Sequence, residues 1–293
     1  AVKGQPVRVD KGVLVEQVVR IQSVNMASGN ISFDGSVYVD GDVLTGMQVH
    51  VTGDIVVSGV VDGGILEAGG NIQVEGGIIA HARVRAAGSV SARFVENSQV
   101  YAGTAIAIDD MVLQSELQAL NQIAVGIKSP QRGRLIGGSA RAMMLVRTPM
   151  LGADVGSLTT VQVGVNPELE ERFQNLVRLA DKQKAEEENL QKLIQNLTKT
   201  GDKHDMLERA KASWQKALQD WAHSLHEKGE LEKQLAMIEG ARVEVSVGVA
   251  GAVSMAFGNK THALRRSFDA GVFALADGRL VFTAASGQAT DVD

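Results

Sequence analysis

The sequence contains no cysteine among its 293 residues, which excludes a disulfide framework and any metal site built on cysteine. Aromatic residues make up only 4%, so a thick globular core would be hard to fill. No apolar run approaches the roughly 20 residues that a membrane-spanning helix needs. The formal net charge of −5 gives no support for nucleic-acid binding. The chain is instead rich in glycine, with 32 residues, which suits thin layers that turn often.

An internal repeat of about 17 residues fills the first half of the chain. One series of glycine-led tetrads, each with an apolar third residue, begins at Gly35, Gly53, Gly70 and Gly88. A second series consists of apolar pairs: Val49/Val51, Leu66/Ala68, Val84/Ala86, Val100/Ala102 and Leu117/Ala119. A third, weaker series contains Val43, Val60 or Val61, Ile78, Val95 and Val112. A constant period with three apolar segments per unit indicates a solenoid.

The spacing inside each segment indicates a strand. Val37 and Val39 are i, i+2 partners and share one face, whereas Tyr38 points to the opposite face. Three strands per repeat, with glycine at corners that need positive φ, predict a mainly β fold, a three-sided parallel β-helix with stacked coils. A β-sandwich is the alternative, but it has no constant period. Recurring five-residue steps, such as Val61 to Leu66, favour a right-handed coil over a left-handed hexapeptide helix.

After Asn166 the spacing of apolar residues changes from that of strands to that of helices. Asn166 suits the N-cap of a helix, and Pro167 suits its first position. Apolar residues then follow a 4-3 heptad register in two arms, with a turn at 200–202. The predicted seam positions are Leu169, Phe173, Leu176, Ala180, Leu190, Ile194 and Leu197, then Leu207, Ala210, Trp214, Ala217, Trp221, Leu231, Leu235 and Ile238. Polar residues interrupt the seam at Gln183, Glu187, Ser224 and Lys228. The pattern predicts an antiparallel coiled-coil hairpin with arms of roughly 50 Å.

Two tryptophans one heptad apart stand out in the second arm. Trp214 and Trp221 either fill the seam opposite smaller residues or form a stripe that docks a protein partner. Segments with the alternating pattern of β-strands return after Gly240, and we expect them to finish the solenoid and cover its end. The predicted domains are therefore a β-helix of residues 1–166 plus 240–293 and an inserted helical hairpin of residues 167–239.

No motif in the sequence predicts catalysis, a cofactor or a metal site. His50 lies between inward Val49 and Val51 and points outward, and His81 lies near a corner. Either histidine could serve as the base of a β-helical acyltransferase, although no extruded loop shapes a substrate cleft. The segment 258–261 superficially resembles a phosphate loop, but Val253 stands where that motif needs glycine. We therefore expect a protein that is not an enzyme.

Charged residues of the later coils offer a second candidate for partner contact. Arg132 and Arg134 are the candidate contact residues, and Arg141 and Arg147 follow in the same stretch. They either meet an acidic protein partner or form a solvated surface. The acidic pair at 109–110 is interpreted as a solvated corner. The flat faces carry outward apolar residues such as Val56, which is compatible with a small homo-oligomer.

The order of these features resembles the polar flagellar assembly protein A family, FapA. The resemblance rests on residues 29–39 (Gly-Asn-Ile-Ser-Phe-Asp-Gly-Ser-Val-Tyr-Val), 53–57, 92–98, 135–140 and 151–152, with a helical hairpin after Val163 and Gly164. It extends from about residue 10 to about residue 285. The C-terminal segment matches least well. The family's N-terminal domain has no counterpart here, and the first residue is Ala1, so we expect the natural protein to be longer.

The resemblance implies a cytoplasmic bacterial protein of flagellar assembly or polar flagellar placement, which acts as a scaffold through contacts with flagellar or polar regulators. It implies no catalytic residue, cofactor, nucleic-acid partner or membrane span. Similar three-sided solenoids occur in bactofilin-type polymers, so a self-assembling structural protein is one alternative. The β-helical acyltransferase is the other.

Overall fold

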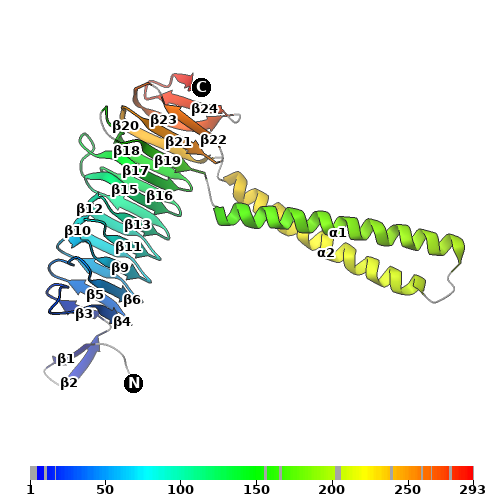
Figure 1. Cartoon of the computed structure of the whole chain (residues 1–293), viewed down its shortest axis with the longest axis horizontal. Helices are drawn as coiled ribbons and strands as arrows, with labels where there is room; N and C mark the ends of the chain where they lie inside the picture. Colours follow the sequence, from blue (N-terminus) through cyan, green and yellow to red (C-terminus); the bar gives the residue numbers. More distant parts are fainter. Residues whose placement is uncertain are drawn as a thin grey trace. The chain divides into compact units, whose positions relative to one another are not determined.

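In a computed structural model of the chain, short strands stack in parallel from coil to coil and form a β-solenoid (Figure 1). The structure describes residues 5–9, 12–16, 18–154, 157–164, 167–201, 206–237, 240–258, 260–264, 266–276 and 279–292. The chain divides into two compact units, one of residues 1–165 and 240–293 and one of residues 166–239.

The solenoid has three faces. The first face contains β3 (Val18–Ile21), β5 (Ser36–Val39), β7 (Ile55–Val57), β14 (Ala105–Ile108), β16 (Gln122–Val125) and the first parts of β10 (Ile72–Ile79), β12 (Val90–Glu96), β18 (Leu145–Leu151) and β20 (Arg242–Val249). The second face contains β8 (Val61–Asp62), the second parts of these four long strands and the first parts of β15 (Met111–Ala119) and β17 (Arg134–Ala142). The third face contains β4 (Ile31–Phe33), β6 (Gln48–Val51), β9 (Ile65–Ala68), β11 (Arg83–Ala86), β13 (Gln99–Ala102), the second parts of β15 and β17, β19 (Thr159–Val163) and β21 (Val253–Phe257).

The strand register confirms the repeat expected from the sequence. Val37, Ile55, Ile72 and Val90 are successive partners on the first face. The second and third series stack in the same way, as Ile78 on Val61 and Leu66 on Val49 illustrate. These inward side chains are at most 1% exposed. The mainly β, parallel solenoid fold is therefore confirmed, together with two helices, whereas the hand of the coil stays a prediction.

The glycines of the first series are needed for close stacking, which corrects the expectation of positive φ. Among the four, only Gly35 has a positive φ, 154°. A Cβ atom on Gly53 would lie 2.8 Å from the carbonyl carbon of Gly35, and one on Gly88 would lie 3.0 Å from the carbonyl oxygen of Gly70. Backbone hydrogen bonds join this column of glycines. The N–H groups of Gly53, Gly70 and Gly88 each donate to the carbonyl of the glycine one coil earlier. A side chain here would push adjacent coils apart.

Positive φ recurs from coil to coil at the corner between the second and third faces. Gly46 and Gly63 have φ of 80° and 64°. In the next coils this conformation falls on residues that bear side chains, namely Ala80, His81, Asn97 and Gln114, with φ between 43° and 62°. Asparagine tolerates this region better than most residues, but alanine and glutamine are uncommon there. This corner adjoins the third face, which carries the groove described below.

Antiparallel strands cover the C-terminal end of the solenoid. β22 (Lys260–Leu264) pairs with β21, and β23 (Phe268–Ala276) pairs with β20. β24 (Arg279–Ala284) and β25 (Ala289–Asp291) extend this sheet, and the rings of Phe268, Phe273 and Phe282 pack with centroids 4.7–5.1 Å apart. At the other end of the chain, β1 (Gln5–Val9) and β2 (Gly12–Glu16) form a separate two-stranded antiparallel sheet. The last segments thus cover an edge that could otherwise pair with another chain.

The second unit contains α1 (Pro167–Thr200) and α2 (Met206–Met237), which lie side by side with opposite chain directions (Figure 1). The predicted helix start at Pro167 is confirmed, and Gly201 follows α1 with φ of 84°, as is common after a helix. The predicted seam positions from Phe173 to Leu197 and from Leu207 to Leu231 are all buried or half-buried. Asn166, Asp202, Ile238 and the side chains of Leu169 and Leu235 lie outside the described residues. Supercoiling of the pair stays a prediction.

Candidate interaction surfaces

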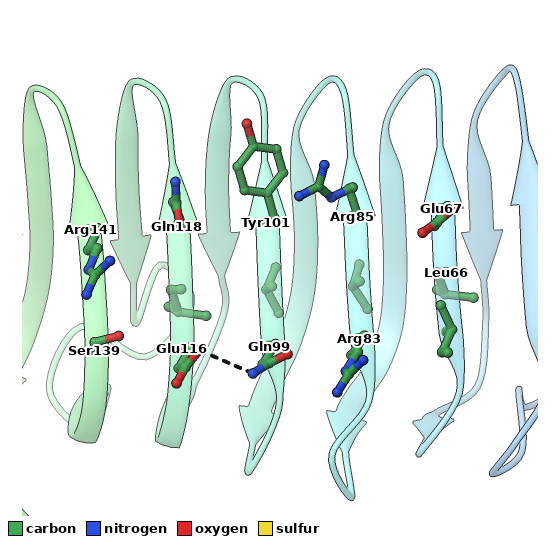
Figure 2. Close-up of a pocket in the computed structure, with 14 residues that line it drawn as sticks. Leu66, Glu67, Arg83, Arg85, Gln99, Tyr101, Glu116, Gln118, Ser139 and Arg141 are labelled. Carbon is green, nitrogen blue, oxygen red and sulfur yellow. Dashed lines mark hydrogen bonds between the residues drawn. The ribbon is translucent and has the colours of Figure 1, made fainter. Parts of the chain in front are cut away.

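Outward side chains of the third face line a shallow groove of about 450 Å³ that crosses β9, β11, β13, β15 and β17. Because alternate residues of a strand point to the same side, the outward residues form two parallel columns (Figure 2). One column contains Arg83, Gln99, Glu116 and Ser139. The other contains Glu67, Arg85, Tyr101, Gln118 and Arg141. We call this surface the groove face.

Neighbouring side chains on the groove face contact one another from coil to coil. Gln99 Nε2 donates a hydrogen bond to Glu116 Oε2 at 3.2 Å (Figure 2). The guanidinium carbon of Arg85 lies 4.5 Å from the centre of the Tyr101 ring, a cation–π contact that holds the ring in place. The groove therefore has an ordered polar lining.

The two histidines considered for acyltransferase chemistry lie near this groove. His50 is exposed on the third face, and its Nδ1 lies 3.1 Å from Glu67 Oε2. His81 is exposed at the positive-φ corner, beside a second hollow of about 330 Å³ that shares Arg83 with the groove. Both side chains are exposed, and His50 points outward from its strand as the sequence predicts. Because His50 and Glu67 are 64% and 51% exposed, this pair lacks the water-excluded cleft that an acyl-transfer site needs.

The four arginines of the later coils are distributed over three faces. Arg134 lies on the second face, where it is in register with Met111 and Met150. Arg141 lies on the groove face, whereas Arg147 lies on the first face and pairs with Glu244 at 2.6 Å. Arg132 is exposed in the turn that precedes β17. Of these four arginines, only the two predicted contact residues lie close together, Arg132 in the turn and Arg134 at the start of β17.

Arg134 is surrounded by apolar side chains that point outward. Met111 is 40% exposed, and Met150, Leu113 and Ile136 are half-buried beside it. Arg134 forms no ion pair within the part of the chain that the structure describes. We call these five residues the Met–Arg strip. Methionine and arginine are enriched in protein interfaces, because methionine adapts to irregular surfaces and arginine combines charge with a broad contact area.

The turn at 128–133, which carries Arg132, is anchored by Asp110. Ser129 Oγ donates to Asp110 Oδ1 at 2.6 Å, and Arg93 Nε donates to Asp110 Oδ2 at 3.1 Å. These hydrogen bonds hold the pKa of Asp110 below its usual value. The interpretation of the acidic pair as a solvated corner misses this anchoring role, since Ser129 is 19 residues away in the sequence.

The tryptophans of α2 are half-buried at seam positions. Trp214 Nε1 donates a hydrogen bond to Glu187 Oε1 of α1 at 2.6 Å, so these two seam residues of opposite helices are partners. Near them Ser224 is buried, and Gln183 Oε1 is buried without a hydrogen-bond partner among the described residues. The geometry agrees with tryptophans that fill the seam, and each ring still presents part of its surface to solvent.

Among the described residues, no group of three or more His, Asp or Glu side chains is placed to hold a metal ion. On α2, His223 Nε2 lies 3.8 Å from Glu227 Oε1. Neither described helix is long and apolar enough to cross a membrane.

Comparison with protein families gives one result that covers most of the chain. The family model for the flagellar assembly protein A beta solenoid domain matches residues 17–280. The matched range includes the whole helical unit. Comparisons with curated proteins and with solved structures give no match.

Proposed function

The chain belongs to the flagellar assembly protein A family, and from that premise we propose that it is a non-enzymatic scaffold, which acts in flagellar assembly or polar flagellar placement through protein–protein contacts. The proposed place of action is the cytoplasm, at the cell pole. The proposed partners are flagellar or polar regulators. A scaffold of this kind needs a stiff frame and exposed surfaces of defined chemistry.

The Met–Arg strip is the observation that carries this proposal. It presents outward methionine, leucine and isoleucine side chains around an arginine without an ion pair in the described chain, on a frame whose backbone is hydrogen-bonded from coil to coil. Apolar side chains on a rigid sheet lose little conformational entropy when a partner covers them. We propose Arg134 as the centre of this contact and Arg132 as its edge.

The helical unit is proposed as a second contact arm, in which the half-buried rings of Trp214 and Trp221 face a partner. We propose that it is a separate domain of residues 167–239, inserted into a β-helix domain of residues 1–166 plus 240–293. The segments that flank the insertion in the sequence support this division. Gly164 N–H donates to the carbonyl of Met143, and Arg242 N–H donates to the carbonyl of the next residue, Met144. The solenoid therefore fixes the exit and return of the chain by itself.

Flagellar number and position test the proposed function. In a strain that lacks this gene, we expect electron microscopy to show lost or misplaced flagella, and the intact gene on a plasmid should restore them. Unchanged flagella in the deletion strain would contradict the scaffold proposal. An Arg134→Glu substitution should reproduce the deletion phenotype while the protein accumulates, whereas Arg20→Glu, a charge reversal on the first face, should not.

A self-assembling polymer is the second candidate, and the covered C-terminal end argues against it. Stacking of solenoid ends needs two open edges, whereas β22 to β25 lie across one end. Light scattering over a range of protein concentrations separates the two ideas. A mass that rises steadily with concentration would favour the polymer, and a fixed mass would set the size of any homo-oligomer.

A further inference from the structure

Three arginines of the groove face, Arg83, Arg85 and Arg141, have no carboxylate partner in the part of the chain that the structure describes. All three are exposed. Arginines on the first face behave differently, because Arg20 pairs with Asp40 and Arg147 with Glu244. The groove face therefore holds positive charge that is not neutralised within the described chain.

The carboxylates on the same face already have partners. Glu67 lies against His50, and Glu116 accepts a hydrogen bond from Gln99. Neither of these contacts involves an arginine. The three guanidinium groups thus remain available to an anionic ligand, and guanidinium groups bind carboxylates through two parallel hydrogen bonds.

The spacing of the arginines matches an extended chain. Arg85 and Arg141 stand in one column, separated by Tyr101 and Gln118. Three steps between coils at about 4.8 Å each place their backbones roughly 14 Å apart. An extended peptide advances about 3.4 Å per residue, so carboxylates four residues apart would reach both arginines. Arg83 lies two residues from Arg85 in the same strand and meets the ligand from the other column.

The remaining groove residues suit the same ligand. Gln99 and Gln118 offer amide groups along the groove, and amides can donate to and accept from a peptide backbone. Tyr101, held by Arg85, offers an aromatic surface between the charged positions (Figure 2). The groove is shallow and long, so it fits a chain that lies along it better than a compact molecule that needs enclosure.

We propose that the groove face binds an extended acidic peptide segment of a protein partner, whose carboxylates pair with Arg83, Arg85 and Arg141. This inference rests on the proposed function only in taking the partner to be a protein. It adds a second surface with its own chemistry to the apolar contact of the Met–Arg strip.

Fluorescence anisotropy on the full chain tests the proposal. The probe is a fluorescein-labelled peptide of alternating Glu and Ser, with a Gln-for-Glu peptide as its matched control. We expect the acidic peptide to bind, the Gln peptide to bind at least tenfold more weakly, and added salt to weaken the acidic complex. The double variant Arg85→Gln/Arg141→Gln should weaken binding of the acidic peptide about tenfold or more.

The matched control is Arg20→Gln/Arg147→Gln, which makes the same charge change on the first face, at exposed arginines that have ion-pair partners. The dissociation constant of this control variant for the acidic peptide should stay within about twofold of that of the unaltered chain. Equal weakening by both double variants would overturn the proposal, since binding would then follow net charge alone. Absence of peptide binding would overturn the proposal as well. So would binding of an acidic polysaccharide, polygalacturonate, in place of the peptide, since the ligand would then not be a protein segment. Flagellar counts in the deletion strain would be unaffected by such a result, so failure here is distinguishable from failure of the scaffold function.

Discussion

Inward side chains of the solenoid are almost completely buried, whereas the seam of the helical pair is only partly so. Ile55 and Leu66 are 0% exposed, and each stacks on an equivalent residue one coil away. In the helical pair, Leu176 is 9% exposed, and polar Glu187 occupies a seam position. Adjacent coils of the solenoid also share backbone hydrogen bonds, but two helices interact through side chains alone. The solenoid is therefore built as a frame, and the helical pair as a thinner structure with less buried area.

The difference suggests how sequence changes are tolerated in the two units. In the solenoid, an inward side chain or a stacked glycine is limited by neighbours on several sides. On the outside of a helix the same change meets only solvent. Substitutions of the same type should therefore have different effects in the two units, and the following predictions test this from the largest expected effect to the smallest.

Truncation of a solenoid core residue should be the most damaging change. Ile106 is 1% exposed, and Ile106→Ala should lower the free energy of unfolding by about 2–5 kcal/mol, because it removes buried methyl groups and leaves a cavity. Urea unfolding measures the loss. The outward neighbour Ala107 serves as the control, since Ala107→Ser should change stability by less than about 0.5 kcal/mol. A loss below about 1 kcal/mol for Ile106→Ala would show that the core is loosely packed.

Glycine-to-alanine substitutions should have opposite signs in the two units. A Cβ atom on Gly103 would run into the carbonyl oxygen of Ala87 in the adjacent coil, so Gly103→Ala should cost about 1–3 kcal/mol. A Cβ atom on Gly229 of α2 would meet no atom within 4 Å, so Gly229→Ala should stabilise its helix by about 0.5–1 kcal/mol. Thermal unfolding of both variants provides the comparison. Two shifts of the same sign would contradict the account of coil stacking.

Removal of the Trp214 hydrogen bond should have a moderate effect on the helical unit. Trp214→Phe deprives Glu187 of its donor and should destabilise the helical unit by about 1 kcal/mol. Helical circular dichroism during thermal unfolding is the readout. In the double variant with Glu187→Leu the loss should be smaller, because the half-buried carboxylate that has lost its donor is then absent too. Additive losses would mean that the two side chains do not interact.

Acid should release the turn at 128–133, with the smallest effect on stability. The pKa of Asp110 is lowered in the folded chain, so its contribution is present above the unfolded value, about pH 3.9, and is lost as pH falls through the folded value. We expect the stability difference between the unaltered chain and Ser129→Ala, less than about 1 kcal/mol at pH 7, to shrink below pH 4. Urea unfolding at several pH values measures it. A difference that grows in acid would contradict the assignment.

The fold follows from the sequence because its signal is periodic. The 17-residue repeat predicts which residues point inward, and Pro167 and Gly201 mark the limits of the first helix. The positive-φ corner is less predictable, since Ala80 and Gln114 occupy it without any glycine signal. The groove face is missed for a different reason. Its arginines come from two separate strands, β11 and β17, and only the register of the stacked strands shows that they share one face.

The most direct test of the central claim uses a protein that lacks residues 167–239, with a short Gly/Ser linker in their place, as the only copy in the deletion strain. The account predicts that this protein accumulates, retains its β-sheet spectrum and unfolds cooperatively, because Gly164 and Arg242 are held by consecutive carbonyls of the solenoid. It also predicts that flagella stay reduced or misplaced, because the contact arm is gone. A shortened protein that restores normal flagella would contradict the role given to the helical pair, and one that fails to fold would contradict the independence of the frame.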